Sequence, residues 1–366
     1  TARIELAREL ARRAIVVLAN DHVLPLSPTL RRIALIGPLA DARAEMLGPW
    51  AMAASAAGPV TIREGLAAAL PEAEIVFAPG VSITGADMSG IAAAREICED
   101  TDIVLMCLGE AANMSGEAAS RANPGLPGVQ GALAEAIFAL GKPVVALISS
   151  GRPLMITAIV EKAKAVVATW FLGAEAGNAI ADVLTGKFNP TGRLPVTWPR
   201  DVGQVPIFFA ARPVGRPADP DDRYTSKYLD MPVEPLFFFG HGLSYSRFAL
   251  TNLRASNSVF KRSGELTIEV DVLNEGPAAG EATVFLFARD MVATVARPLL
   301  ELKGVGKAAL RPGESGTVCF RLAAEALAFP GSDLKPVFEP GEFLLLAGQS
   351  ADPRQMLTIK VRARPD

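Results

Sequence analysis

Five short apolar runs, each almost free of polar residues and each followed by a segment with helical spacing, constrain the fold of this chain more than any other feature. The runs are RIALIG (32–37), EIVFAPG (74–80), DIVLMCLG (102–109), PVVALISS (143–150) and AVVATWFLG (165–173). Strands that are apolar at every position must be covered on both faces, which is typical of parallel sheets. The pattern predicts an α/β sandwich domain, with a mainly parallel sheet and helices on both faces, and RLPVTW (193–198) could close the series.

From about residue 248 the apolar residues recur at every second position instead. The stretches ELTIEVDVLNEGPAAGEATVFLFARD, KAALRPGESGTVCFRL and PVFEPGEFLLLAGQS alternate and then break at turn residues, around 274–277, 311–313 and 339–341. Short alternating strands separated by Pro and Gly turns predict an antiparallel sandwich. The sequence therefore predicts a second domain that is an all-β sandwich of fibronectin type III-like form.

These patterns divide the chain into four segments. Residues 1–28 are expected to form an amphipathic linker helix and a connection, and residues 29–200 the α/β sandwich. Residues 201–247 are rich in Pro, Asp and Arg and predict a long irregular connection, after which 248–366 form the fibronectin type III-like domain.

Residue counts exclude several classes of function. Lys and Arg number 36 against 39 Asp and Glu, the formal net charge is −3, and no basic run is present, so nucleic acid and membrane surfaces are not expected partners. The chain has two histidines and three cysteines, Cys98, Cys107 and Cys319, without metal-ligand or C-x-x-C spacing. We therefore expect no metal, no cofactor and no disulfide framework.

The segment that follows DIVLMCLG contains the first candidate site. Its nineteen residues, EAANMSGEAASRANPGLPG, are far more than the usual two to six between a strand and a helix, and long loops of this kind are often functional. In open α/β sheets the ligand crevice lies beyond the carboxyl ends of the strands. Glu117 lies between Gly116 and Ala118, so we favour a general acid or base over a solvated loop charge, whereas Glu110 suits a structural hydrogen-bonding role.

Glycoside cleavage is a common reaction that depends on carboxylates without a histidine, but it needs a second carboxyl group. The connection contains Asp219, Asp221, Asp222 and Asp230, and nothing in their context marks one of them as a buried nucleophile. Trp170 could stack on a sugar ring, although a core position is the more common role for a tryptophan. No G-x-S-x-G elbow, Walker motif or G-x-G-x-x-G fingerprint is present.

Six stretches resemble the C-terminal portion of glycoside hydrolase family 3, the β-glucosidase and β-xylosidase family, most of all its periplasmic bacterial β-glucosidases. They are IALIGPLAD, GEAANMSGEAASRANPGLPGVQ, GKPVVALISSGRPL, ATWFLGAEAGNAIADVLTGKFNPTGRLPVTWPR, PLFFFGHGLSYSRF and VLNEGPAAGEATVFLFARD. Together they span almost the whole chain in the order that the family has.

The resemblance implies a retaining, exo-acting β-glucosidase that removes terminal β-D-glucosyl residues from oligosaccharides or glucosides. In that family an N-terminal (β/α)8 barrel supplies the aspartate nucleophile, and a loop of the α/β sandwich supplies the acid/base glutamate. By motif that glutamate is Glu117, while Ser115, Arg121 and Glu110 would orient it or contact the substrate.

The resemblance also implies a barrel that is not in this chain, because residues 1–28 look like the helix and connection that leave it. We therefore expect the nucleophile to lie outside this chain, and the chain alone to be inactive. The expected partners are a β-linked glucoside or oligosaccharide, the barrel on the same gene product or a separate chain, and a second copy in a homodimer. The expected location is the periplasm or the exterior of the cell.

Two other hypotheses stay open. The chain could be a stand-alone carbohydrate-binding or scaffold protein that binds sugars weakly and turns nothing over. It could also be an unrelated α/β hydrolase, which the lack of nucleophile and histidine motifs disfavours.

Overall fold

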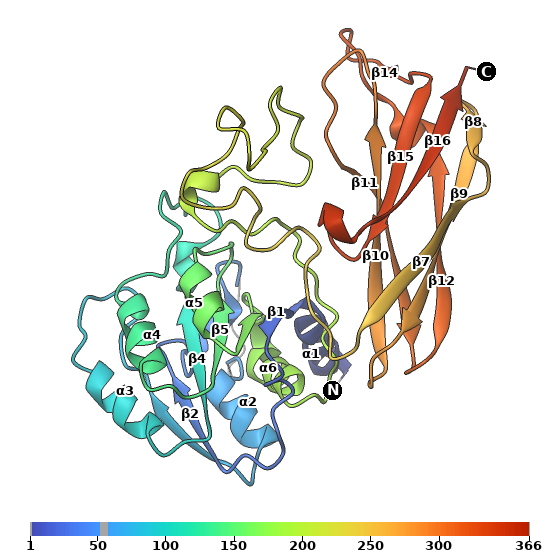
Figure 1. The fold of residues 1–366 in the computed structure, drawn as a ribbon. Helices are drawn as coiled ribbons and strands as arrows, with labels where there is room; N and C mark the ends of the chain where they lie inside the picture. The colour runs from blue at the N-terminus through green and yellow to red at the C-terminus, as the bar shows by residue number, and fades with distance from the viewer. Residues whose placement is uncertain (1, 52–57, 366) are drawn as a thin grey trace. The chain divides into compact units, whose positions relative to one another are not determined.

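The computed structural model describes residues 2–51 and 58–365, which form two compact units (Figure 1). The first, the α/β unit, comprises the chain up to Arg193 together with Pro199–Val205 and Gly242–Tyr245. The second, the β unit, comprises Leu194–Trp198, Pro206–His241 and the chain from Ser246 onward. The change of sequence pattern near residue 248 therefore corresponds to a change from one packed body to another.

The α/β unit follows the predicted alternation of strands and helices. Its strands are β1 (Val16–Asn20), β2 (Arg32–Ile36), β3 (Glu74–Ala78), β4 (Ile103–Gly109), β5 (Val144–Ser149) and β6 (Ala165–Ala168). Its α-helices are α1 (Ala2–Ala14), α2 (Ile62–Ala69), α3 (Ile91–Cys98), α4 (Gln130–Phe138), α5 (Thr157–Lys162) and α6 (Ala176–Leu184). The strands lie in the order β1-β6-β5-β4-β2-β3, parallel except for β1.

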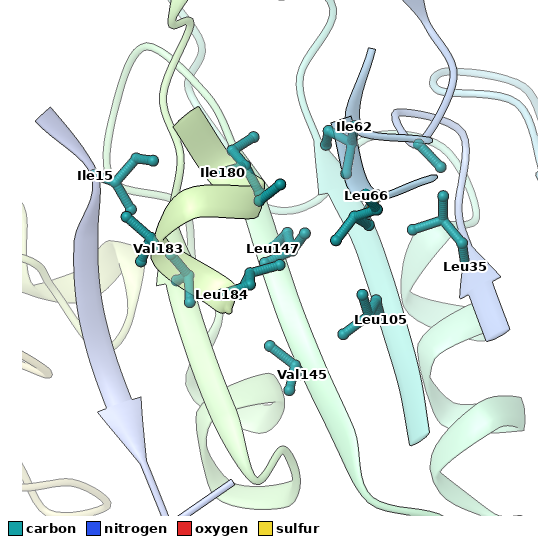
Figure 2. Packing of buried hydrophobic residues seen from close by; sticks show 14 of the residues in the cluster. Ile15, Leu35, Ile62, Leu66, Leu105, Val145, Leu147, Ile180, Val183 and Leu184 are labelled. Atoms are coloured by element: carbon teal, nitrogen blue, oxygen red, sulfur yellow. The ribbon is translucent and has the colours of Figure 1, made fainter. Parts of the chain in front are cut away.

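The sheet is buried on both faces, which is why its strands carry no polar alternation. Leu105, Val145 and Leu147 pack with α2 and α6 in one cluster, which Figure 2 shows. The residues between them in sequence, such as Val104 and Ala146, point to the opposite face and are equally buried, on the side that α3, α4 and α5 cover (Figure 1). The prediction of a mainly parallel sheet with helices on both faces is confirmed.

The first 28 residues differ from the expected linker helix and connection. The helix is present as α1, but Ile4, Leu6 and Leu10 are exposed, and α1 is held through Arg8, whose guanidinium makes two 2.6 Å hydrogen bonds to the buried Asp182 of α6. Residues Val16–Asn20 are not a connection, since they form β1, antiparallel to β6. A five-residue apolar run has no periodicity that separates an edge strand from a connection, so tertiary pairing decided this assignment.

The β unit is the sandwich that the alternation predicts, and all but one of its described strand pairings are antiparallel. Its main strands are β7 (Phe248–Ala255), β8 (Val259–Lys261), β9 (Glu265–Asn274), β10 (Gly280–Asp290), β11 (Glu301–Leu310), β12 (Ser315–Ala323), β15 (Gly341–Gly348) and β16 (Leu357–Arg364). One sheet has the order β11-β10-β15-β16-β8 and the other β12-β9-β7. The inward residues of both sheets share one core, in which Ile268, Val284 and Leu345 are fully buried.

The connection predicted for residues 201–247 has no strand, and its only regular element is the short 3₁₀ helix Val202–Gln204. Most of this segment, Pro206–His241, packs as part of the β unit. Phe209 and Phe239, whose ring centroids are 4.5 Å apart, pack on Phe285 and Phe287, so β10 is buried on both faces.

One expectation about a strand was wrong. Residues 193–198 form no strand, and Trp198 makes only an isolated bridge to Phe237, because Pro195 lacks the N–H that a sheet ladder requires. The turn around 339–341 separates two strands as expected, but they do not pair with each other: β14 (Pro336–Val337) pairs with β13 (Phe329–Pro330), while β15 pairs with β10 and β16. The turn was visible in the sequence, but the partner strands were not.

No helix within the described ranges is both long and apolar enough to cross a membrane.

Candidate active site

Hydrogen bonds hold the backbone at the start of the long loop that contains the candidate residues. Gly109 ends β4 opposite Ser149 of β5, and the N–H of Glu110 donates to the Ser149 carbonyl at 2.8 Å. The buried amide of Gln130, in the first turn of α4, bonds both the N–H and the carbonyl of Gly109 at 2.8 Å. Because β4 and β5 are parallel, the segments that follow them begin at the same edge of the sheet.

Glu110 is the anchor of this loop. Its side chain is 0% exposed and accepts hydrogen bonds from Ser115 Oγ at 2.9 Å and Arg121 Nη1 at 2.7 Å. A second guanidinium, that of Arg152, lies 3.2 Å away. A buried carboxylate is tolerated when it is paired and hydrogen-bonded, as here. These bonds are of the kind expected for a structural hydrogen-bonding group at a strand end, and a role of Glu110 in orienting Glu117 or contacting the substrate stays a prediction.

The two arginines also bind the backbone of the loop. Arg121 Nη2 donates to the Gly125 carbonyl at 2.9 Å, and Arg152 Nη2 donates to the carbonyls of Met114 and of Ala119, the latter at 2.7 Å. Charged donors make stronger hydrogen bonds than neutral ones. Arg152 thus fixes the backbone on both sides of residues 116–118, and we call the group Glu110, Arg121 and Arg152 the loop clamp.

Arg152 is the site residue that the sequence analysis missed. It follows β5 by three residues, in SSGRPL, and β5 is the neighbour of β4 in the sheet. The end of the adjacent parallel strand is where a partner for Glu110 is to be expected. The position of Arg152 after an apolar strand is visible in the sequence. Only the strand order, which places β5 beside β4, shows that this position is close to Glu110.

The tip of the loop presents Glu117 to solvent. Gly116 has φ +92° and Ala118 has φ +58°, so both flanking residues are left-handed, and residues 116–118 are exposed. An alanine in this region is strained by roughly 1 kcal/mol, which the fixed backbone at Met114 and Ala119 can hold. Among the residues that the structure describes, none makes a hydrogen bond or ion pair with the Glu117 carboxylate. The loop backbone is held by hydrogen bonds, and its acidic side chain has no partner among the described residues.

An exposed tryptophan lies beside this tip. A Cβ placed on Gly116 would be 3.1 Å from Pro49 Cβ and 3.4 Å from Trp50 Cζ2, and Trp50 is 70% exposed. Trp170, for which a core position was the favoured expectation over sugar stacking, is half-buried, and its Nε1 donates to the Ala14 carbonyl at 3.1 Å. Trp50 is therefore an exposed tryptophan beside Gly116, the residue that precedes Glu117.

The predicted site residues divide into two groups. The structure brings together Glu110, Ser115 and Arg121, and places Glu117 at the tip of the same loop. Neither Ser115 nor Arg121 bonds Glu117 itself, so any effect that they have on it passes through the loop backbone.

The four aspartates of the connection lie in the β unit and are exposed. Asp219 Oδ1 accepts from the N–H of Asp221 at 2.9 Å, and Asp222 Oδ1 accepts from the N–H of Tyr224 at 2.9 Å. These are local turn-stabilising bonds. Within the described part of the chain, no group of three or more His, Cys, Asp or Glu residues could hold a metal ion.

Comparison with known families decides what this arrangement belongs to. The model of the glycosyl hydrolase family 3 C-terminal domain matches residues 15–245, and that of a fibronectin type III-like domain matches residues 282–351. The chain belongs to glycosyl hydrolase family 3. The family resemblance inferred from the sequence motifs is therefore confirmed.

Among family 3 relatives, the chain is 37% identical to the periplasmic β-glucosidase of Salmonella typhimurium, over 93% of this chain and 48% of that protein. It is 35% identical to a β-xylosidase of Formosa agariphila, over 98% of this chain and 50% of that protein. A crystal structure of a mutant β-glucosidase from Listeria innocua in complex with laminaribiose matches with a TM-score of 0.91 and 34% identity, over 98% of this chain and 49% of that chain. The chain thus spans about half the length of these family 3 relatives.

Proposed function

We propose that this chain supplies the acid/base carboxylate, Glu117, of a retaining, exo-acting β-glucosidase, while an N-terminal barrel supplies the aspartate nucleophile. The substrates would be β-linked glucosides or oligosaccharides with a terminal β-D-glucosyl residue. Relatives named β-glucosidase, among them one crystallised with laminaribiose, support this substrate class.

One observation carries the proposal. Glu117 is the carboxylate at the tip of a clamped loop, exposed and without a protein partner among the described residues, at the carboxyl edge of the sheet. A structural carboxylate is normally paired, as Glu110 is, whereas a general acid must be free to bond the substrate. Trp50, which is 70% exposed and lies beside Gly116, suits stacking on a sugar ring.

The chemistry follows from these positions. In the first step Glu117 would donate its proton to the glycosidic oxygen as the nucleophile attacks the anomeric carbon, so that the bond to the leaving group breaks and a glycosyl-enzyme forms. In the second step the Glu117 carboxylate would take a proton from water, which attacks the anomeric carbon and releases the sugar. Retaining enzymes hold the two carboxyl groups about 5 Å apart.

The same proposal covers partners and location. The barrel would lie on the same gene product or on a separate chain, and this chain alone would be inactive. A homodimer and a periplasmic or secreted location stay predictions, the latter supported by the periplasmic relative from Salmonella typhimurium.

The first test compares the 366-residue chain with a longer protein that contains the barrel, by release of nitrophenol from an aryl β-glucoside. We expect turnover only from the longer protein. An activated 2-deoxy-2-fluoroglucoside should label the longer protein, and peptide mapping should place the label outside this chain. A label on a residue of this chain would refute the split of catalytic roles.

The second test is Glu117→Gln in the longer protein, with Glu96→Gln, an exposed glutamate of α3, as the matched control. Glu117→Gln should slow hydrolysis by 10²- to 10⁴-fold, which is roughly what general acid–base catalysis contributes, and leave fluoroglucoside labelling intact. Sugar binding without labelling or turnover in any form of the protein would instead favour the carbohydrate-binding or scaffold alternative.

A further inference from the structure

The β unit contains a cavity that none of the residues in the loop of Glu117 lines. It has a volume of about 380 Å³ and lies on the outer face of the five-stranded sheet, over Leu344 and Leu346 of β15. All of its lining residues belong to the β unit. Small-molecule sites in proteins begin at about this size.

The walls of the cavity are apolar and firmly packed. Phe208, Phe209 and Phe238 line it together with four leucines. Phe209 is fixed by ring contacts with Phe239 at 4.5 Å and with Phe287 at 5.6 Å between centroids. The cavity therefore lies beside a completed aromatic cluster, so it is not a gap that those rings could fill by turning.

Two residues with polar side chains, Thr197 and Arg289, line this otherwise apolar cavity. Thr197 Oγ1 is itself buried in the protein, so Thr197 offers no accessible donor to the cavity. Arg289, on β10, is half-buried, and no described residue makes a hydrogen bond or ion pair with its guanidinium. A partly desolvated guanidinium gains from a ligand that supplies the missing acceptor.

The neighbouring arginines of the β unit are already neutralised. Arg354 bonds Asp352 at 2.7 Å, and Arg297 bonds Glu301 at 2.6 Å. No Asp or Glu lines the cavity, so Arg289 gives it a positive charge. The charge complement of this site is an anion.

We infer that this cavity is a binding site for an organic anion with an apolar, ring-bearing body, such as an aromatic carboxylate or sulfonate. The rings would fill the space between the phenylalanines and leucines, and the anionic group would accept hydrogen bonds from Arg289. A second sugar subsite does not fit, because most hydroxyls of a glucosyl unit would face leucine and phenylalanine without partners.

A matched pair of fluorescent probes tests the inference on the full 366-residue chain. 8-Anilinonaphthalene-1-sulfonate has the anionic group and the aromatic body, and N-phenyl-1-naphthylamine has the same body without the charge. We expect saturable binding of the sulfonate at one site per chain, and binding of the neutral analogue that is weaker by roughly tenfold or more. Equal affinities, or several sulfonates per chain, would overturn the inference.

Arg289→Met keeps the side-chain length and removes the charge. It should weaken the sulfonate by roughly tenfold or more and leave the neutral probe unchanged. Arg321→Met, on an exposed position of β12, is the control and should bind both probes like the parent chain. Equal effects of the two variants would refute the site. The sulfonate could also bind to this chain but not to a longer, barrel-containing protein. In that case another domain covers the cavity, and the inference is refuted.

Discussion

Arg152→Ala is the sharpest perturbation of the loop clamp, because Arg152 is the residue that holds the backbone on both sides of Glu117. The change removes the hydrogen bonds to the Met114 and Ala119 carbonyls and one of the two guanidinium partners of Glu110. Hydrogen bonds to charged groups contribute about 1.5–3 kcal/mol each. Met114 and Ala119 are half-buried, so water can replace part of the lost hydrogen bonding to their carbonyls. We therefore use the low end of this energy range, about 1.5 kcal/mol for each bond.

Two such bonds amount to about 3 kcal/mol, which corresponds to roughly a hundredfold smaller population of the clamped loop relative to open ones. Proton donation by Glu117 should fall by at most the same factor, which lies within what general acid catalysis supplies. Protonation matters most for a poor leaving group. We therefore expect kcat/KM in the barrel-containing protein to fall by up to roughly a hundredfold for phenyl β-glucoside, and by less than about tenfold for 2,4-dinitrophenyl β-glucoside.

Arg254→Ala is the control, because it also removes an arginine that bonds two carboxylates, at 2.8 and 3.0 Å, but on an exposed face of the β unit. It should leave both substrates unaffected. Equal losses on both substrates for Arg152→Ala, or no loss, would refute the role of the clamp. Glu117→Gln should also lower kcat/KM more for the phenyl than for the 2,4-dinitrophenyl glucoside. If it lowers kcat/KM equally for both, the proposed role of Glu117 is refuted, and not only that of the clamp.

Three further predictions concern the packing of the α/β unit and the cysteines. Asp182→Asn removes the buried partner of two arginines of α1 and should lower the free energy of unfolding by about 2 kcal/mol. This is less than for a fully buried ion pair, because the two arginines are partly exposed. An unchanged midpoint of urea unfolding would contradict the prediction. Gly65→Ala puts a Cβ 2.2 Å from a carbonyl of α6 and should cost more than about 2 kcal/mol in the same assay. In the folded chain at pH 8, iodoacetamide should label Cys319 but neither Cys98 nor Cys107, because burial raises the pKa of Cys98 to about 11 and that of Cys107 further. The pKa of Cys319 is raised as well, chiefly by desolvation and then by neighbouring Glu269, so its thiolate fraction and its labelling rate, followed by mass spectrometry, should increase as the pH rises above 8.

Much of the α/β unit could be predicted because its sequence repeats one pattern, a short apolar run that forms a strand between two layers of helices. β2 to β6 each begin within one residue of the start of their apolar run, since a strand that is buried on both faces leaves no other pattern. The loop of Glu117 could be found for a similar reason, because its length and its place after β4 are local properties. Its clamp could not, because Glu110 and Arg152 are 42 residues apart and meet only through the order of strands in the sheet.

The sequence by itself determined the fold class, the change from helical to alternating period near residue 248, and Glu117 as the candidate acid/base. These depend on the periodicity and spacing of residues close together in the chain. Only the tertiary structure decided that Val16–Asn20 is an edge strand, that Phe209 and Phe239 cover β10, and that Glu110 is neutralised by two arginines. All three features are contacts between segments that are distant in the chain: the pairing of two strands, the covering of the outer face of a strand, and the pairing of a buried charge. No local pattern of residues specifies such contacts.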